Sequence, residues 1–146
     1  MPRLFVVIPV FEEPHTLEPC VRRAIEAPLP PGWRARLLLV DDAAIAALHG
    51  RWLGDGSPTD VITFDLGAGA GLCGDIACST ETAVREAARF GWPARYELAY
   101  YAIHGLLHLA GYDDRDVAPR RAMRKREREV FAALGLPAPP RRTRRR

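Results

Sequence analysis

The sequence predicts an α+β fold, with a four-stranded mixed sheet covered by about five helices, mainly on one face. Short runs rich in β-branched and aromatic residues, bounded by Pro or Gly, recur in the first half of the chain. From about residue 81 onward, apolar residues fall instead at helical spacing. The 146 residues, 48% of them hydrophobic, suffice for one domain with a buried core, which we place at residues 1–136.

Four strands and five helices are expected along the chain. The first strand is a short apolar run that Pro9 closes, and prolines also close the first helix. Either Asp41 or Asp42 can cap the second helix. The predicted strands are Arg3–Pro9, Arg34–Val40, Asp60–Leu66 and Leu72–Ser79. The predicted helices are Thr16–Ala27, Ala43–Leu53, Glu81–Phe90, Ala94–Ala110 and Pro119–Leu134.

Composition argues against a membrane protein and against a disulfide scaffold. The apolar run Leu4–Val10 is too short for a signal peptide or a membrane span. The three cysteines, Cys20, Cys73 and Cys78, form no C-x-x-C pair, which favours a reducing cytoplasm. Five arginines lie within residues 141–146, so we expect 137–146 to be a flexible basic tail that either holds phosphate backbones or only solubilises the chain.

A glycine motif follows the third predicted strand. Gly69, Gly71 and Gly74 spell G-x-G-x-x-G, the pattern of a dinucleotide-binding turn. Such a turn must open a helix whose N-terminus faces the phosphates, but the residues after Gly74 continue as a strand. We therefore interpret the glycines as a loop between two strands.

Two histidines and nearby aspartates form the most informative cluster. His104 and His108 are four residues apart, so on a helix their rings project from one face and can bind one cation. Gly111 can end the helix in the left-handed conformation and let Asp113 or Asp114 approach the rings. Two imidazoles and a carboxylate suit one divalent transition metal, typically zinc, with a coordination position left open for catalysis.

The plainer interpretation is that both histidines are ordinary, partly buried residues with hydrogen-bonded rings. For an isolated H-x-x-x-H pair that interpretation is the more common outcome. The helix-ending glycine and the aspartates directly after the second histidine favour a metal site at the end of the helix.

The stretch H-G-L-L-H-L-A-G-Y-D-D, from His104 to Asp114, resembles the signature of the YbeY family of metal-dependent endoribonucleases, which usually reads H-G-x-L-H-L-x-G-Y-D-H. Pro58–Phe64 and Gly74–Ser79 resemble the family's P-T-D-V-L-S-F and G-D-I-x-I-S strands. Met123 and Glu127 match a similar M-x-x-x-E in the last helix. The resemblance spans about residues 37 to 134.

This resemblance implies the ligand set His104, His108 and Asp114, with Asp114 in place of the family's third histidine. It further implies a Zn²⁺-dependent endoribonuclease that cleaves single-stranded RNA in the cytoplasm. The implied partners are the precursor of 16S-type ribosomal RNA and the small ribosomal subunit, with roles in maturation and quality control and none on DNA. A second departure is Leu53, which aligns with the family's usual arginine, and Arg51 would lie on a different side of its helix.

Two other functions remain open from the sequence. A zinc peptidase needs a glutamate beside the first histidine, where this chain has Gly105. A non-catalytic, metal-stabilised RNA- or ribosome-binding module would have a closed site of four protein ligands, which would require Asp113 or Asp116 to bind as well.

Overall fold

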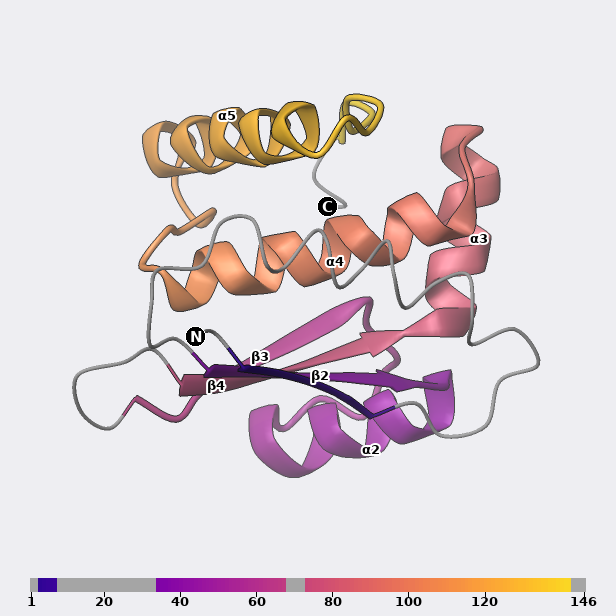
Figure 1. The fold of residues 1–146 in the computed structure, drawn as a ribbon. Helices are drawn as coiled ribbons and strands as arrows, with labels where there is room; N and C mark the ends of the chain where they lie inside the picture. Colours follow the sequence, from indigo (N-terminus) through magenta and orange to yellow (C-terminus); the bar gives the residue numbers. More distant parts are fainter. Residues whose placement is uncertain (1–2, 8–33, 68–72, 143–146) are drawn as a thin grey trace.

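A mixed β-sheet with helices on both faces forms the described part of the chain (Figure 1). The structure is a computed structural model that describes residues 3–7, 34–67 and 73–142. Its strands are β1 (Arg3–Val7), β2 (Arg34–Val40), β3 (Val61–Asp65) and β4 (Cys73–Ser79). Its helices are α2 (Asp42–Leu53), α3 (Thr80–Phe90), α4 (Ala94–Leu109) and α5 (Val117–Ala133).

The predicted α+β class and the mixed sheet are confirmed, and one detail of the prediction changes. Four of the five predicted helices lie among the described residues, and the remaining predicted helix, Thr16–Ala27, lies outside them. The sheet is covered on both faces, since α2 packs on the face opposite α4 (Figure 1). Asp41 caps α2 by accepting a hydrogen bond from the Ala44 N–H, which settles the choice between the two aspartates.

The strands lie in the order β1-β2-β4-β3, which makes β3 an edge strand next to the central β4. β1 pairs with β2, and β2 with β4, in parallel, whereas β3 runs antiparallel to β4. Successive side chains point to opposite faces of the sheet. Leu37 and Leu39 of β2 therefore join the core under α4, while Val40 packs with Ile45 of α2.

α4 is the central helix, and it lies unusually close to the sheet. A Cβ atom at Gly105 would stand 2.7 Å from Ile76 Cγ2 of β4 and 3.1 Å from Thr63 Oγ1 of β3. A Cβ at Gly74 would meet Leu109 at 2.6 Å. Both glycines thus permit the helix to contact β3 and β4 directly. Gly74 lies within β4, as the loop interpretation of the glycine motif expects, while Gly69 and Gly71 lie outside the described residues.

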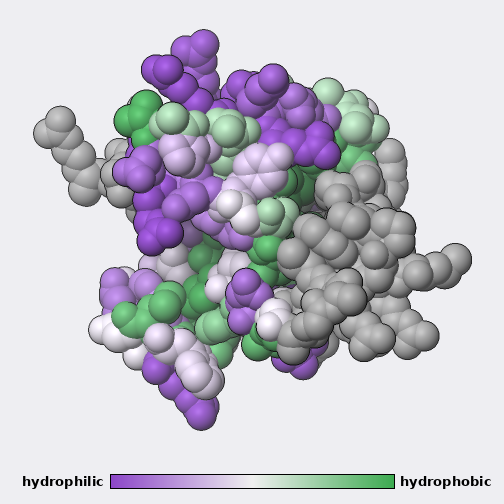
Figure 2. All heavy atoms as spheres, turned by 90° about the vertical axis from the view of Figure 1, so that its left-hand side faces the viewer, coloured by the Kyte–Doolittle hydropathy of each residue, from purple (hydrophilic) through white to green (hydrophobic). Residues whose placement is uncertain are grey.

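α5 packs over α4 as a second helical layer on the same side of the sheet (Figure 1). Met123, Glu127, Val130 and Phe131 form its buried face. The rest of α5 is strongly polar, and Figure 2 shows hydrophilic side chains over the top of the molecule, where α5 lies. None of the helices in the described ranges combines the length and apolar character needed to cross a bilayer.

Residues 137–142 lie against the body of the domain. The Arg142 guanidinium donates to both carboxylate oxygens of Glu97, at 2.6 and 2.7 Å. It also lies 3.7 Å from the centroid of the Tyr100 ring. Glu97 is fully buried, so this ion pair and stacking contact hold the segment, which we call the C-terminal arm (residues 137–142), on the body.

Replacing Gly105 by Ala is expected to lower the free energy of unfolding by about 1–3 kcal/mol, because the added methyl group overlaps Ile76 and Thr63. Urea denaturation followed by circular dichroism measures this change. Gly56→Ala is the matched control, since nothing lies within 4 Å of a Cβ at that position. Equal stability of the two variants would contradict the close approach of α4.

Replacing Arg142 by Gln is expected to lower the free energy of unfolding by about 3–5 kcal/mol, because Glu97 would be left as an uncompensated buried charge. The double variant Glu97→Gln/Arg142→Gln should recover part of that loss. Arg141→Gln removes the same charge from the neighbouring exposed position and should change stability by less than about 0.5 kcal/mol. An Arg142→Gln variant as stable as Arg141→Gln would show that the arm is not held by this pair.

Candidate metal centre

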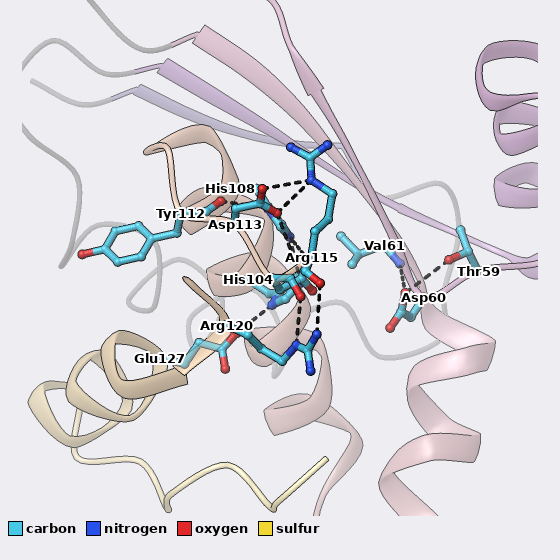
Figure 3. A network of polar contacts seen from close by, with 11 residues as sticks. Thr59, Asp60, Val61, His104, His108, Tyr112, Asp113, Arg115, Arg120 and Glu127 are labelled. Carbon is cyan, nitrogen blue, oxygen red and sulfur yellow. Dashed lines mark hydrogen bonds and ion pairs between the residues drawn. The ribbon is translucent and has the colours of Figure 1, made fainter. Parts of the chain in front are cut away.

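The last two turns of α4 bring the two predicted histidines together (Figure 3). His104 Nε2 and His108 Nε2 are 3.1 Å apart. Asp114, in the loop after the helix, places one carboxylate oxygen 3.6 Å from His104 Nε2 and the other 3.7 Å from His108 Nε2. The three predicted ligands thus converge, and within the described ranges they are the group whose ligand atoms could hold one metal ion.

The end of α4 orients His108. Gly111 has φ +96° and donates its N–H to the His108 carbonyl, while the Tyr112 N–H donates to the Leu107 carbonyl. These two bonds form the Schellman motif, which confirms the left-handed conformation expected of the glycine. The turn also brings the Tyr112 carbonyl 3.1 Å from His108 Nδ1, which donates to it. The cap therefore fixes both the ring and its tautomer.

Glu127 of α5 orients His104. Its Oε1 lies 2.7 Å from His104 Nδ1, and because a carboxylate accepts, that nitrogen carries the proton. The Glu127 side chain is only 4% exposed, so water competes little for this bond. A carboxylate behind a histidine ring is the usual way in which proteins orient and strengthen a metal-binding imidazole.

These two tautomers leave both Nε2 lone pairs facing each other across 3.1 Å, without a proton between them. Such a contact is repulsive unless a cation lies between the nitrogens. Protonation of His108 does not relieve it easily, because burial, and then the neighbouring His104, lower the pKa of His108 below its ordinary value. Three ligands about 2.0–2.1 Å from a tetrahedral ion would be about 3.4 Å apart, and the observed separations bracket that value. The donor set fits a divalent cation.

The loop that carries Asp114 is held from both sides (Figure 3). The Arg120 Nε–H of α5 donates to the Asp114 carbonyl at 2.9 Å, and its terminal nitrogen donates to the Arg115 carbonyl at 3.1 Å. Asp113 accepts from both the backbone and the side chain of Arg115. Asp113 is thus used within the loop, and neither Asp113 nor Asp116 joins the three-residue group.

A cavity of about 320 Å³ opens beside His104 and Asp114. It lies between the start of β3, the end of α3, and the facing sides of α4 and α5. Five arginines are among its lining residues, namely Arg89, Arg115, Arg120, Arg124 and Arg142. Asp60 also lines it, with its carboxylate accepting from the Val61 N–H and the Thr59 hydroxyl. We call this cavity the metal cleft.

Sequence reasoning missed the residues that support the ligands. The motif names Glu127 without giving it a role. A glutamate four residues after Met123, on the apolar side of a helix, is nevertheless a usable signal of a buried carboxylate with a partner. Arg120 and Arg142 carry no such signal, since each is one of many arginines in its region. Leu53 is exposed at the end of α2, and neither Leu53 nor Arg51 lines the metal cleft.

Two histidines and a carboxylate converge beside an arginine-lined cleft. The protein is therefore an α+β domain with a candidate metal centre. The model of the family described as "Endoribonuclease YbeY" matches residues 13–135. The chain belongs to this family, as its sequence motifs predict.

Several curated relatives are similar over most of the chain. "Endoribonuclease YbeY" of Moorella thermoacetica is 41% identical over 112 residues, which cover 68% of this chain and 72% of that protein. The protein of the same name from Methylocella silvestris is 39% identical over 136 residues, which cover 88% of this chain and 77% of the relative. The relative from Pelotomaculum thermopropionicum is 39% identical over 108 residues, or 68% of this chain and 71% of that one.

A solved structure shares the fold. The solution structure of TM1509 from Thermotoga maritima superimposes with a TM-score of 0.56 at 23% identity, covering 96% of this chain and all of that one. At this identity the likeness concerns the fold alone, and it agrees with the α+β architecture described above.

Replacing Glu127 by Gln is expected to weaken zinc affinity about 10–100-fold, because the amide no longer supplies the charge behind His104 that strengthens its Nε2 as a ligand. Calorimetric titration with zinc measures the effect without reference to activity. Glu129→Gln is the control, since Glu129 is exposed on the same helix and pairs with Arg126. Equal zinc affinity of the two variants would show that Glu127 does not act through the histidine.

Proposed function

We propose that this protein is a zinc-dependent endoribonuclease that cleaves single-stranded RNA, with the ion held by His104, His108 and Asp114. The observation that carries the proposal is the pair of converging Nε2 lone pairs beside the Asp114 carboxylate, at the wall of an arginine-lined cleft. Membership of the endoribonuclease family supports the reaction, and the donor set supports the choice of metal.

Each residue of the centre has a defined task. His104 and His108 offer neutral nitrogens, and Asp114 adds one negative charge to the ligand set. Glu127 and the Tyr112 carbonyl keep the two rings in the binding tautomer. When bound, the divalent ion supplies Lewis acidity toward a phosphodiester oxygen and lowers the pKa of a water molecule toward neutrality.

The arginines of the metal cleft are suited to holding the charged backbone of the substrate. Arg120 is engaged with two carbonyl groups and Arg115 with Asp113, so these two mainly fix the loop. Arg124 makes no ion pair with any residue in the described ranges, and its guanidinium is therefore available to a phosphate. Bidentate pairing of a guanidinium with phosphate oxygens would position the strand beside the ligands.

The alternatives from the sequence fit the geometry less well. A structural metal site is normally closed by four protein ligands, whereas three converge here among the described residues, which leaves a position for water or substrate. A peptidase would need a general base beside His104, and Gly105 instead packs against Ile76 of β4. Both points favour a catalytic nuclease.

We further propose that the substrate is the precursor of small-subunit ribosomal RNA. The partner would be the small ribosomal subunit, and the protein would act in the cytoplasm. This proposal rests on the resemblance of the His104–Asp114 stretch to the family signature, and the roles in maturation and quality control rest on the same resemblance. The high arginine content of the cleft is compatible with a ribonucleoprotein substrate.

Replacing His108 by Ala is expected to abolish zinc binding and RNA cleavage together, because two remaining ligands do not hold the ion. Metal analysis of the purified variant and a cleavage assay on labelled single-stranded RNA check both effects, with a chelator-treated sample of the unsubstituted chain beside them. His49→Ala is the control, since the His49 ring bonds to the Ser57 carbonyl and belongs to no such group. Undiminished cleavage by His108→Ala would place the active site elsewhere.

A further inference from the structure

A second cavity, of about 860 Å³, lies between α5 and the C-terminal arm. One wall is the side of α5 that carries Arg121, Arg124 and Arg128, and the other is the arm from Ala138 to Arg142. Consecutive prolines at 139 and 140 restrict the backbone of that second wall. We call this cavity the arm groove.

The arm groove holds positive charges that nothing in the described structure neutralises. Arg121, Arg124 and Arg128 are spaced i, i+3 and i+7, so they share one side of the helix. None of them forms an ion pair or a hydrogen bond with another described residue, and neither does Arg141 on the arm. By contrast, Lys125 and Arg126 are not among the residues that line the groove, and both pair with Glu129.

The acidic groups near the arm groove are already engaged. Glu127 is the carboxylate among its lining residues, and it accepts from His104. Glu97 is occupied by Arg142, the fifth arginine of the groove. Four unpaired guanidinium groups along one groove repel each other, so a polyanion that lies between them would be bound strongly and with a marked dependence on salt.

The arm groove continues the metal cleft. Tyr100, Arg124, Glu127 and Arg142 line both cavities. Arg142 marks the junction, where its contacts with Glu97 and Tyr100 hold the arm in place. A strand with its reactive phosphodiester beside His104 would therefore meet the groove arginines as it leaves the cleft.

We propose that the arm groove is a backbone-binding subsite for single-stranded RNA, in which Arg121, Arg124, Arg128 and Arg141 bind consecutive phosphates of a strand that extends from the metal cleft. This inference rests on the proposed function, because the occupant of the groove is the continuation of the substrate. The contacts are to phosphates, so the subsite adds affinity for longer strands without selecting their sequence.

The test measures binding of fluorescent single-stranded RNA, from about 4 to 16 nucleotides long, to the full-length chain carrying His108→Ala, so that cleavage does not consume the probe. The groove variant adds Arg121→Gln, Arg124→Gln and Arg128→Gln. Its salt slope, log K against log [salt], should be smaller by about 2 for the longest strand, at roughly 0.7 per lost phosphate contact. Raising the salt from 50 to 200 mM lowers the affinity of both proteins, and the factor of this loss should be about 20 times smaller for the groove variant than for the parent.

The matched control removes three positive charges outside the groove, with Arg95→Gln, Lys125→Gln and Arg126→Gln in the same parent. The subsite is supported if the groove variant alone loses the gain in affinity with strand length. Equal losses in the two triple variants would overturn it, because only net charge would then matter. Displacement of the RNA by poly-glutamate at equal charge concentration would also overturn it, in favour of an acidic protein partner.

Failure of this inference differs from failure of the proposed function. Cleavage that requires His108, together with unaltered length dependence in the groove variant, would overturn the subsite and leave the nuclease standing. Length-dependent binding lost only in the groove variant, in a chain whose unsubstituted form does not cleave RNA with zinc present, would support the subsite and contradict the nuclease.

Discussion

The close contact of α4 with β3 and β4 is the constraint on which the rest of the structure depends. Gly105 lies between the two histidines in the chain, and its missing side chain lets the helix contact Ile76 and Thr63. This contact fixes the rotation of α4 about its axis. With Gly105 facing the sheet, His104 lines the metal cleft, where Glu127 of α5 meets its ring, and the His108 ring lies next to it. The packing of α4 on the sheet thus also determines the direction in which the two histidine rings point.

Two independent sets of hydrogen bonds then act on the same centre. The Schellman turn around Gly111 places the Tyr112 carbonyl behind His108, and α5 places Glu127 behind His104 and Arg120 behind Asp114. Because the bonds come from different elements, the ligands are held before any ion arrives, which reduces the entropy lost on binding. Arg142 of the C-terminal arm forms a further part of the wall of the metal cleft.

Several features were determined by the sequence alone. The spacing of His104 and His108, the glycine at 111 and the aspartate at 114 specified the ligand cluster, because a helix and its cap are local structures whose geometry follows from a few neighbouring residues. The short runs of strand-forming residues in the first half and the helical spacing after residue 81 specified the elements and the fold class for the same reason. The family also follows from these local motifs.

Only the tertiary structure decided which distant residues serve the site. Glu127 is 23 residues from His104, and Arg142 is 45 residues from Glu97, and no local rule relates them. α2 covers the second face of the sheet because residues alternate on β2 and both faces are apolar, which the order of the elements did not reveal. Arg142 is one of several arginines at the end of the sequence. It differs from the others because it pairs with the buried carboxylate of Glu97, which is distant in the chain. Such pairings depend on how the elements pack, not on what each segment prefers by itself.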